Sequence, residues 1–176
     1  MKISIKDITS LSDQSKKFTG LCDIREFSYL GSDFSIAHVE PFDVVLSMIG
    51  SGKLHITFDT CSTIVGSCDR CLTEVSFDIP VSIDETVEVS EGQVVVDEEI
   101  GPYSFIDGED IDVDELILNE ILLNFPAKIL CQDDCKGICP VCGKNRNDES
   151  CDCDDTVLDP RMAQFLDVFN SFKEVK

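Results

Sequence analysis

Eight of the ten cysteines in this 176-residue chain fall into four close pairs, and their spacing constrains the fold more than any other feature. The pairs are Cys68 with Cys71, Cys131 with Cys135, Cys139 with Cys142, and Cys151 with Cys153. Two thiolates that lie two residues apart in a turn can face one ion, and tetrahedral zinc takes four such ligands. The glycine after the third pair, Gly143, lets the backbone curl so that its amides point at sulfur. The spacing therefore predicts Zn²⁺ as a structural cofactor.

The eight ligands can be divided between sites in more than one way. The favoured division places the last two pairs in one site, because these four cysteines lie within 15 residues and need no other ligand. The first two pairs then form a second site that ties the first half of the chain to the C-terminal segment. The competing division is a single site made of Cys68, Cys71, Cys139 and Cys142. An iron–sulfur cluster also uses four thiolates and stays open as an alternative metal group.

Apolar patterns in the first half of the chain predict an antiparallel β region. The runs 42–49 and 54–58 are rich in branched side chains, and Gly50-Ser51-Gly52 separates them as in a hairpin. Residues 75–83 alternate apolar and polar side chains with a period of two, and Pro80 indicates an edge strand or a bulge. A short strand is expected around Ile3 and Ile5. Weaker strand candidates lie at 94–96 and 103–105.

Helices are predicted later in the chain. One begins after Asp112, whose side chain can cap it, with Glu115 three residues later as in a capping box. Its apolar face recurs at helical spacing until Pro126 ends the pattern. A C-terminal helix is predicted from Asp159 and Pro160, because Asp is a good cap and Pro fits the first helical position. Its apolar stripe consists of Met162, Phe165, Leu166, Phe169 and Phe172.

These patterns together predict an α+β fold with two regions. Residues 1–127 are expected to form a β-rich domain that carries an acidic segment and the central helix. Residues 128–176 are expected to form a Cys-rich zinc-knuckle segment that ends in the C-terminal helix. We expect the two regions to pack as one unit, because the first two cysteine pairs would share a metal.

The net charge of −21 is concentrated in one part of the chain. The stretch 71–127 holds 16 acidic residues and neither Lys nor Arg. Binding to phosphates or to an anionic membrane surface requires Lys and Arg, so this composition disfavours direct nucleic-acid binding and membrane attachment. The stretch fits instead a surface that meets a basic protein. A solvated face that only keeps the protein soluble is the alternative.

The remaining motifs favour a cytoplasmic protein that is not an enzyme. The chain has neither a signal-peptide-like start nor a run of transmembrane length, and in a reducing cytosol its cysteines indicate metal rather than disulfides. A phosphate-binding loop, a nucleophile elbow and an H-E-x-x-H motif are all missing, so no small-molecule substrate is expected. A thiol redox role for Cys68 and Cys71 stays a weaker alternative, because a strand rather than a helix is predicted to follow them.

The motifs C-D-R-C-L at 68–72, C-K-G-I-C-P-V-C-G at 135–143, C-D-C at 151–153 and D-P-R at 159–161 occur in one order along the chain. In this combination the sequence resembles the bacterial YceD-like family of large ribosomal RNA subunit accumulation proteins. One departure is Asn145-Arg146-Asn147, where an apolar residue is expected between the asparagines.

The resemblance implies a non-enzymatic role in the accumulation, processing or stability of large-subunit ribosomal RNA during ribosome biogenesis. It also implies a partner, a basic ribosomal protein or assembly factor, through which so acidic a chain reaches ribosomal RNA indirectly. The alternative is a direct RNA-binding zinc knuckle whose basic side chains are Lys136, Lys144 and Arg146.

Overall fold

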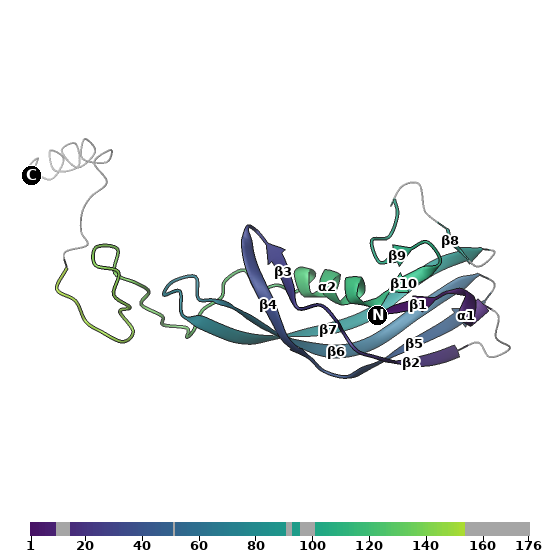
Figure 1. The fold of residues 1–176 in the computed structure, drawn as a ribbon, viewed down its shortest axis with the longest axis horizontal. Helices are drawn as coiled ribbons and strands as arrows, with labels where there is room; N and C mark the ends of the chain where they lie inside the picture. The colour runs from purple at the N-terminus through teal and green to yellow at the C-terminus, as the bar shows by residue number, and fades with distance from the viewer. Residues whose placement is uncertain (10–14, 51, 91–92, 96–100, 154–176) are drawn as a thin grey trace, which may run out of the picture. The chain divides into compact units, whose positions relative to one another are not determined.

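The computed structural model of the protein describes residues 1–9, 15–50, 52–90, 93–95 and 101–153 (Figure 1). The chain divides into two compact units. We call Met1–Ser67 with Glu74–Ile129 the β unit, and Cys68–Thr73 with Leu130–Lys176 the Cys-rich unit. The hairpin loop 68–73 therefore belongs with the C-terminal segment rather than with the strands that flank it.

In its described residues the β unit contains ten strands and two helices. In chain order they are β1 (Lys2–Ser4), α1 (Lys6–Thr9), β2 (Ser15–Gly20), β3 (Glu26–Tyr29), β4 (Ser32–Val39), β5 (Phe42–Ile49), β6 (Lys53–Ser67), β7 (Glu74–Ser90), β8 (Gln93–Val94), β9 (Ile106–Asp107), β10 (Asp110–Asp112) and α2 (Val113–Leu123).

The long strand β6 organises the large sheet, because it pairs with three neighbours. Along one edge it pairs with β7 over its whole length, from Lys53 opposite Glu88 to Ser67 opposite Glu74. Along the other edge its first half pairs with β5 and its second half with β4. Strands β2 and β3 extend the sheet beyond β5 and β4, and every pairing is antiparallel. Strands β1, β10 and β9 form a separate small sheet.

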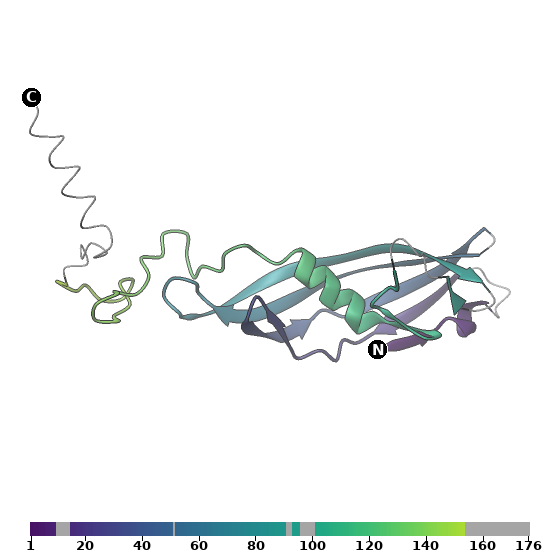
Figure 2. The same ribbon diagram turned by 90° about the horizontal axis from the view of Figure 1, so that it is seen from above.

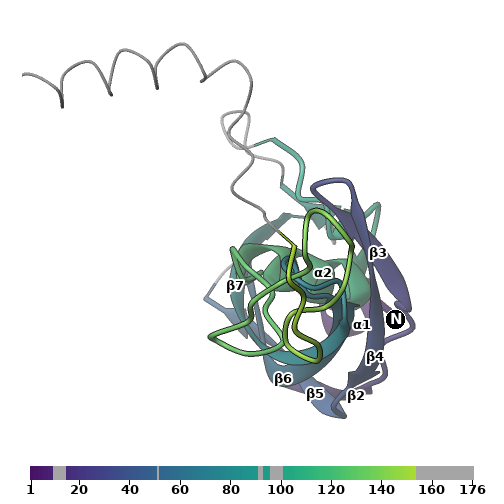
Figure 3. The same cartoon turned by 90° about the vertical axis from the view of Figure 1, so that its left-hand side faces the viewer.

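Alternation of apolar and polar side chains gives the large sheet one buried face. In β6 the side chains of Leu54 and Ile56 are fully buried, and in β7 Ile79 and Val81 are nearly so. The intervening residues of β7 face solvent. Figure 3 shows the strands curving around α2, and Figure 2 shows α2 lying obliquely across them.

Helix α2 fills the concave side of the sheet. The Asp112 side chain accepts hydrogen bonds from the backbone amides of Asp114 (3.1 Å) and Glu115 (3.4 Å), and so caps the first turn. The buried face of the helix consists of Val113, Leu116, Ile117 and Ile121. These side chains join the buried residues of β5, β6 and β7 in one apolar core.

The prediction of an α+β fold is wrong, because strands dominate the described residues. Helix α2 has only 11 residues and packs against the sheet. The prediction missed β2, β3 and β4, and β6 and β7 are far longer than the runs 54–58 and 75–83 indicated. The strand predicted at 103–105 is also wrong, since turn residues precede β9 there. The C-terminal helix predicted from Asp159 lies outside the described residues. Among the helices that the structure describes, none has the length and apolar character to span a membrane.

Candidate metal centres

The Cys-rich unit gathers eight cysteines into two groups of four. We call Cys68, Cys71, Cys131 and Cys135 the first cysteine group, and Cys139, Cys142, Cys151 and Cys153 the second cysteine group. Within each group all sulfur atoms lie within 4.8 Å of one another. All ten cysteines of the chain are described and free of disulfides, and Cys22 and Cys61 lie in neither group. These are the two sets that the sequence spacing favoured; that they bind metal stays a prediction.

Two similar backbone turns present the C-x-x-C cysteines. The Leu72 amide donates to the Cys68 carbonyl (2.9 Å), and the Gly143 amide donates to the Cys139 carbonyl (2.8 Å). The residue after each second cysteine has a positive φ, +61° at Leu72 and +74° at Gly143. Glycine adopts this conformation freely, whereas leucine pays a cost of about 1–2 kcal/mol. The same turn therefore occurs at both C-x-x-C motifs, and at the first of them Leu72 adopts a strained backbone conformation.

A short hairpin carries Cys139 and Cys142 in the turn at its tip. Ile138 forms an antiparallel bridge with Asn145, and the Arg146 amide donates to the Gly137 carbonyl (2.9 Å). Gly137 has a φ of +73°, and a Cβ there would lie 3.0 Å from the Arg70 carbonyl oxygen. The glycine thus allows the hairpin to approach the loop 68–73, where the Ile138 amide donates to that same carbonyl (3.0 Å).

Three polar side chains that sequence analysis did not assign to the site surround the sulfur atoms. Asn147 donates from Nδ2 to the Cys135 sulfur (3.3 Å), and Arg146 donates to the Cys139 sulfur (3.6 Å). Arg70 donates to the Cys135 carbonyl oxygen (2.8 Å). Partners of this kind orient metal ligands. For Arg146 and Asn147 the sequence did offer a signal, because Asn145-Arg146-Asn147 departs from the family pattern, in which an apolar residue is expected at position 146. The Arg146 side chain contacts a sulfur there.

The electrostatics of the first cysteine group favour a cation. Burial disfavours the Cys68 thiolate, but hydrogen bonds from the amides of Arg70, Cys71 and Cys131 outweigh it and lower the pKa of Cys68 to about 6. The neighbouring Cys71 sulfur and burial raise the pKa of Cys131 to about 12. The Cys68 thiol therefore ionises readily, whereas ionisation of Cys131 is opposed by the negative charge of the neighbouring sulfurs.

The second cysteine group shows the same division. Hydrogen bonds from the amides of Cys142 and Val141 lower the pKa of Cys139 to about 6. The Cys142 sulfur and burial raise the pKa of Cys153 to about 12. A divalent cation between four sulfurs relieves this repulsion and allows all four thiols to ionise.

The sulfur–sulfur distances of the first cysteine group fit tetrahedral zinc. Sulfurs that each lie about 2.3 Å from a central Zn²⁺ are separated by about 3.8 Å. In the first group the Cys68 and Cys135 sulfurs are 3.8 Å apart, and those of Cys71 and Cys131 are 3.5 Å apart. Four cysteine ligands complete the coordination of zinc and leave no position for a substrate or water, which is typical of structural sites.

The described surroundings give little support to the two alternative roles of these residues. Strand β7, not a helix, follows Cys71, so the C-x-x-C motif lacks the helix N-terminus of a thioredoxin-like redox site. Of the three bases that would contact RNA, Lys144 pairs with Glu149 (2.9 Å) and Arg146 faces a sulfur.

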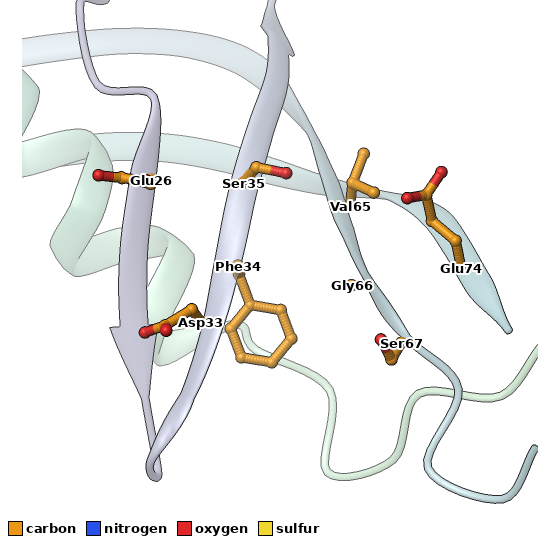
Figure 4. A pocket seen from close by; sticks show the side chains of 8 residues that line it. All are labelled: Glu26, Asp33, Phe34, Ser35, Val65, Gly66, Ser67 and Glu74. Atoms are coloured by element: carbon orange, nitrogen blue, oxygen red, sulfur yellow. The ribbon is translucent and has the colours of Figure 1, made fainter. Parts of the chain in front are cut away.

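The β unit contains a separate acidic hollow of about 310 Å³ where β4 diverges from β6 (Figure 4). The Phe34 ring lies between the two strands, with Glu26 and Asp33 on one side and Glu74 on the other. The ring fits there because residue 66 is glycine; a Cβ would lie 2.8 Å from it. Its described lining includes neither His nor Cys, so the hollow offers carboxylates for a positive group rather than a nucleophile.

Comparison with known proteins gives a family and relatives. The model of the family described as "Large ribosomal RNA subunit accumulation protein YceD" matches residues 56–169. Uncharacterized proteins of Mycobacterium bovis and Mycobacterium tuberculosis are 28% identical over an alignment of 137 residues, which covers 72% of this chain but only 60% of their own length. The uncharacterized protein YlbN of Bacillus subtilis is 26% identical over 165 residues, 93% of either chain. No solved structure matches the chain significantly.

Proposed function

This chain belongs to the YceD family of large ribosomal RNA subunit accumulation proteins, and from that premise we propose that it is a non-enzymatic, cytoplasmic factor in large-subunit assembly. In this proposal it supports the accumulation, processing or stability of large-subunit ribosomal RNA by binding a basic ribosomal protein or assembly factor. It reaches RNA through that partner rather than through its own surface.

One observation carries the choice of a protein partner: the acidic residues of the base-free stretch 71–127 all belong to the β unit. Its 16 acidic residues include Glu74 at the hollow and the exposed Asp78, Asp84 and Glu88 of β7. Lysines from outside the stretch pair with a few of these acids, such as Lys53 with Glu88, but the acids outnumber them. A predominantly negative surface steers a partner of the opposite sign and repels the phosphates of naked RNA.

We assign Zn²⁺ at both cysteine groups a structural role. The metal supplies folding energy to a segment with few apolar contacts, and the chemistry it contributes is charge neutralisation of four thiolates. Two bound zinc ions would leave each group with a net charge of −2, which adds to the acidity of the chain.

Affinity capture with the full-length, zinc-loaded protein tests the proposed partner. From ribonuclease-treated extract at low salt we expect a basic large-subunit protein or assembly factor to be retained, and high salt should release it because salt screens the charges. A double variant D78N/D84N should lose most of the captured protein. The matched control D23N/E40Q removes two exposed acids outside the base-free stretch and should behave as wild type. Retention of naked ribosomal RNA that persists at high salt would overturn the proposal.

A further inference from the structure

The outer edge of β7 carries backbone groups that pair with no described residue over most of its length. Strand β7 pairs with β6 along one edge, and on the other edge only Val89 and Ser90 pair, with β8. The Val89 amide donates to the Gly52 carbonyl (2.7 Å) on the β6 side, whereas the Glu88 carbonyl accepts from the Val95 amide (2.7 Å) on the opposite side. Successive residues of a strand point their backbone N–H and C=O groups to opposite edges. The even-numbered residues of β7 therefore point these groups away from β6, toward the outer edge.

Pro80 agrees with this assignment. It lies opposite Cys61 in the ladder and has an even number, so its missing N–H costs no hydrogen bond to β6. Between the terminal acids Glu74 and Glu88, the outward-pointing amide donors are those of Ser76, Asp78, Ser82, Asp84 and Thr86. The interpretation of Pro80 as an edge-strand residue is confirmed by this pairing.

The charge beside this edge identifies the kind of strand that fits. The even-numbered side chains of β7 are exposed, and the acids among them are Glu74, Asp78, Asp84 and Glu88. On neighbouring β6, Asp59 adds a further carboxylate and accepts a hydrogen bond from Ser82 (2.7 Å). Two of these acids already have a partner on β6, because Lys53 pairs with Glu88 (3.6 Å) and the His55 ring hydrogen-bonds to Asp84 (2.7 Å), so the one lysine of β6 is already neutralised.

We propose that a basic, extended segment of a protein partner adds as a strand to the outer edge of β7. This inference rests on the proposed function and names the way in which the basic partner is held. Main-chain hydrogen bonds to the even-numbered residues supply affinity, and Lys or Arg side chains at alternate positions of the added strand meet the β7 carboxylates.

The same features argue against a second copy of this chain as the occupant. Two β7 edges side by side would place carboxylates against carboxylates, and like charges on adjacent strands are destabilising. Proline and charged side chains on an edge are also devices that prevent self-association. A basic segment turns these repulsive charges into attractive ones.

Amide exchange measured by NMR on the full-length, zinc-loaded protein tests the proposal. The probe is a synthetic peptide of alternating lysine and valine. We expect it to slow exchange at the even-numbered amides of Ser76, Asp78, Ser82, Asp84 and Thr86, whereas odd-numbered amides of β7 are already protected by β6. A peptide of the same sequence with N-methylated alternate residues keeps its charge but cannot complete the ladder, and should bind about tenfold more weakly.

A pair of substitutions at one position tests the edge from the protein side. Ser82→Pro removes an outward amide and places a ring on the edge, whereas Ser82→Ala keeps the amide and loses the hydrogen bond to Asp59. We expect Ser82→Ala to bind the peptide as wild type does and Ser82→Pro to bind about tenfold more weakly. Unchanged thermal unfolding and zinc content show that the proline variant is folded. If it is not, the N-methylated peptide with wild-type protein still decides the question.

The outcomes separate the two proposals. Equal binding of both peptides, or protection that does not alternate along β7, overturns strand addition. If the affinity capture still retains a basic protein, the proposed function stands and the partner binds elsewhere. If the capture retains RNA alone while the peptide adds to β7, the edge is a docking site and the proposed function fails.

Discussion

The two units of the protein place their apolar side chains in opposite ways. In the β unit, branched and aromatic side chains from the strands and α2 form one buried core. In the described part of the Cys-rich unit, the buried side chains are Cys68, Cys71, Cys135 and Cys139. Larger apolar side chains there are exposed, Leu72 by 66% and Val141 by 59%. One unit is organised by the hydrophobic effect and the other by its sulfur atoms.

The contrast shows that two sources of folding free energy can serve one short chain. Burial of apolar surface contributes about 25 cal/mol per Å², which suffices for a unit with many buried side chains. The Cys-rich unit lacks such surface, and binding of a structural zinc contributes on the order of 10 kcal/mol instead. The two units should therefore respond differently to the same perturbation.

Metal removal should produce the largest difference. A strong zinc chelator should unfold the Cys-rich unit, because removal of the metal removes the binding free energy that stabilises it, and should leave the β signal in far-UV circular dichroism largely intact. Elemental analysis beforehand should give two zinc ions per chain. If the chelated protein keeps all protected amides of residues 130–153, the metal does not hold this unit together.

Cysteine variants sharpen this test. Cys68→Ser should lower the zinc content to one ion per chain, because the first cysteine group loses a ligand while the second stays complete. The matched control is Cys61→Ser, which lies outside both groups and should keep two zinc ions. Equal zinc content in the two variants would contradict the assignment.

A core substitution should give the converse result. Leu54 is fully buried in β6, and Leu54→Ala should lower the free energy of unfolding of the β unit by about 2–5 kcal/mol. Zinc content in the absence of denaturant should stay at two ions per chain. Leu123→Ala is the matched control, since Leu123 is 80% exposed and should cost less than about 0.5 kcal/mol. Denaturant titration followed by circular dichroism measures both, and similar losses for both variants would argue against the assigned core.

A smaller effect is expected from the polar partners of the sulfurs. Asn147 donates to the Cys135 sulfur and accepts from the Lys136 amide (2.8 Å). Asn147→Ala should weaken zinc binding at the first cysteine group by about 10- to 100-fold, as loss of a partner that orients a ligand does. Competition with a chromophoric chelator measures the affinity. The matched control is Asn124→Ala, at the end of α2 in the β unit, which should leave the zinc affinity unchanged. An equal loss of affinity in both variants would contradict the role assigned to Asn147.

Local patterns predicted those elements whose signal is complete within a few residues. The run 42–49 is β5, and Asp112 caps α2. The hairpin of β3 and β4 was missed although Phe27 and Tyr29 alternate on β3 as strand residues do, because its turn holds Leu30 at a φ of +50° where an asparagine is usual. The second half of β6 was missed because polar residues such as Thr60 and Ser62 interrupt its apolar pattern. Pairing with the distant strands β7 and β4 stabilises this part of the strand.

The cysteine spacing by itself defined the four pairs of sulfurs, because residues two to four apart are close in any compact backbone. Which pairs come together in one group was left open by the spacing and was decided by the tertiary structure. The concentration of negative charge in the stretch 71–127 also follows from the sequence. Tertiary structure alone decided that Asn147 and Arg146 face sulfur atoms, and that β7, with its even-numbered acids exposed, has a free edge beside them. These properties depend on pairings between distant residues, which local periodicity does not encode.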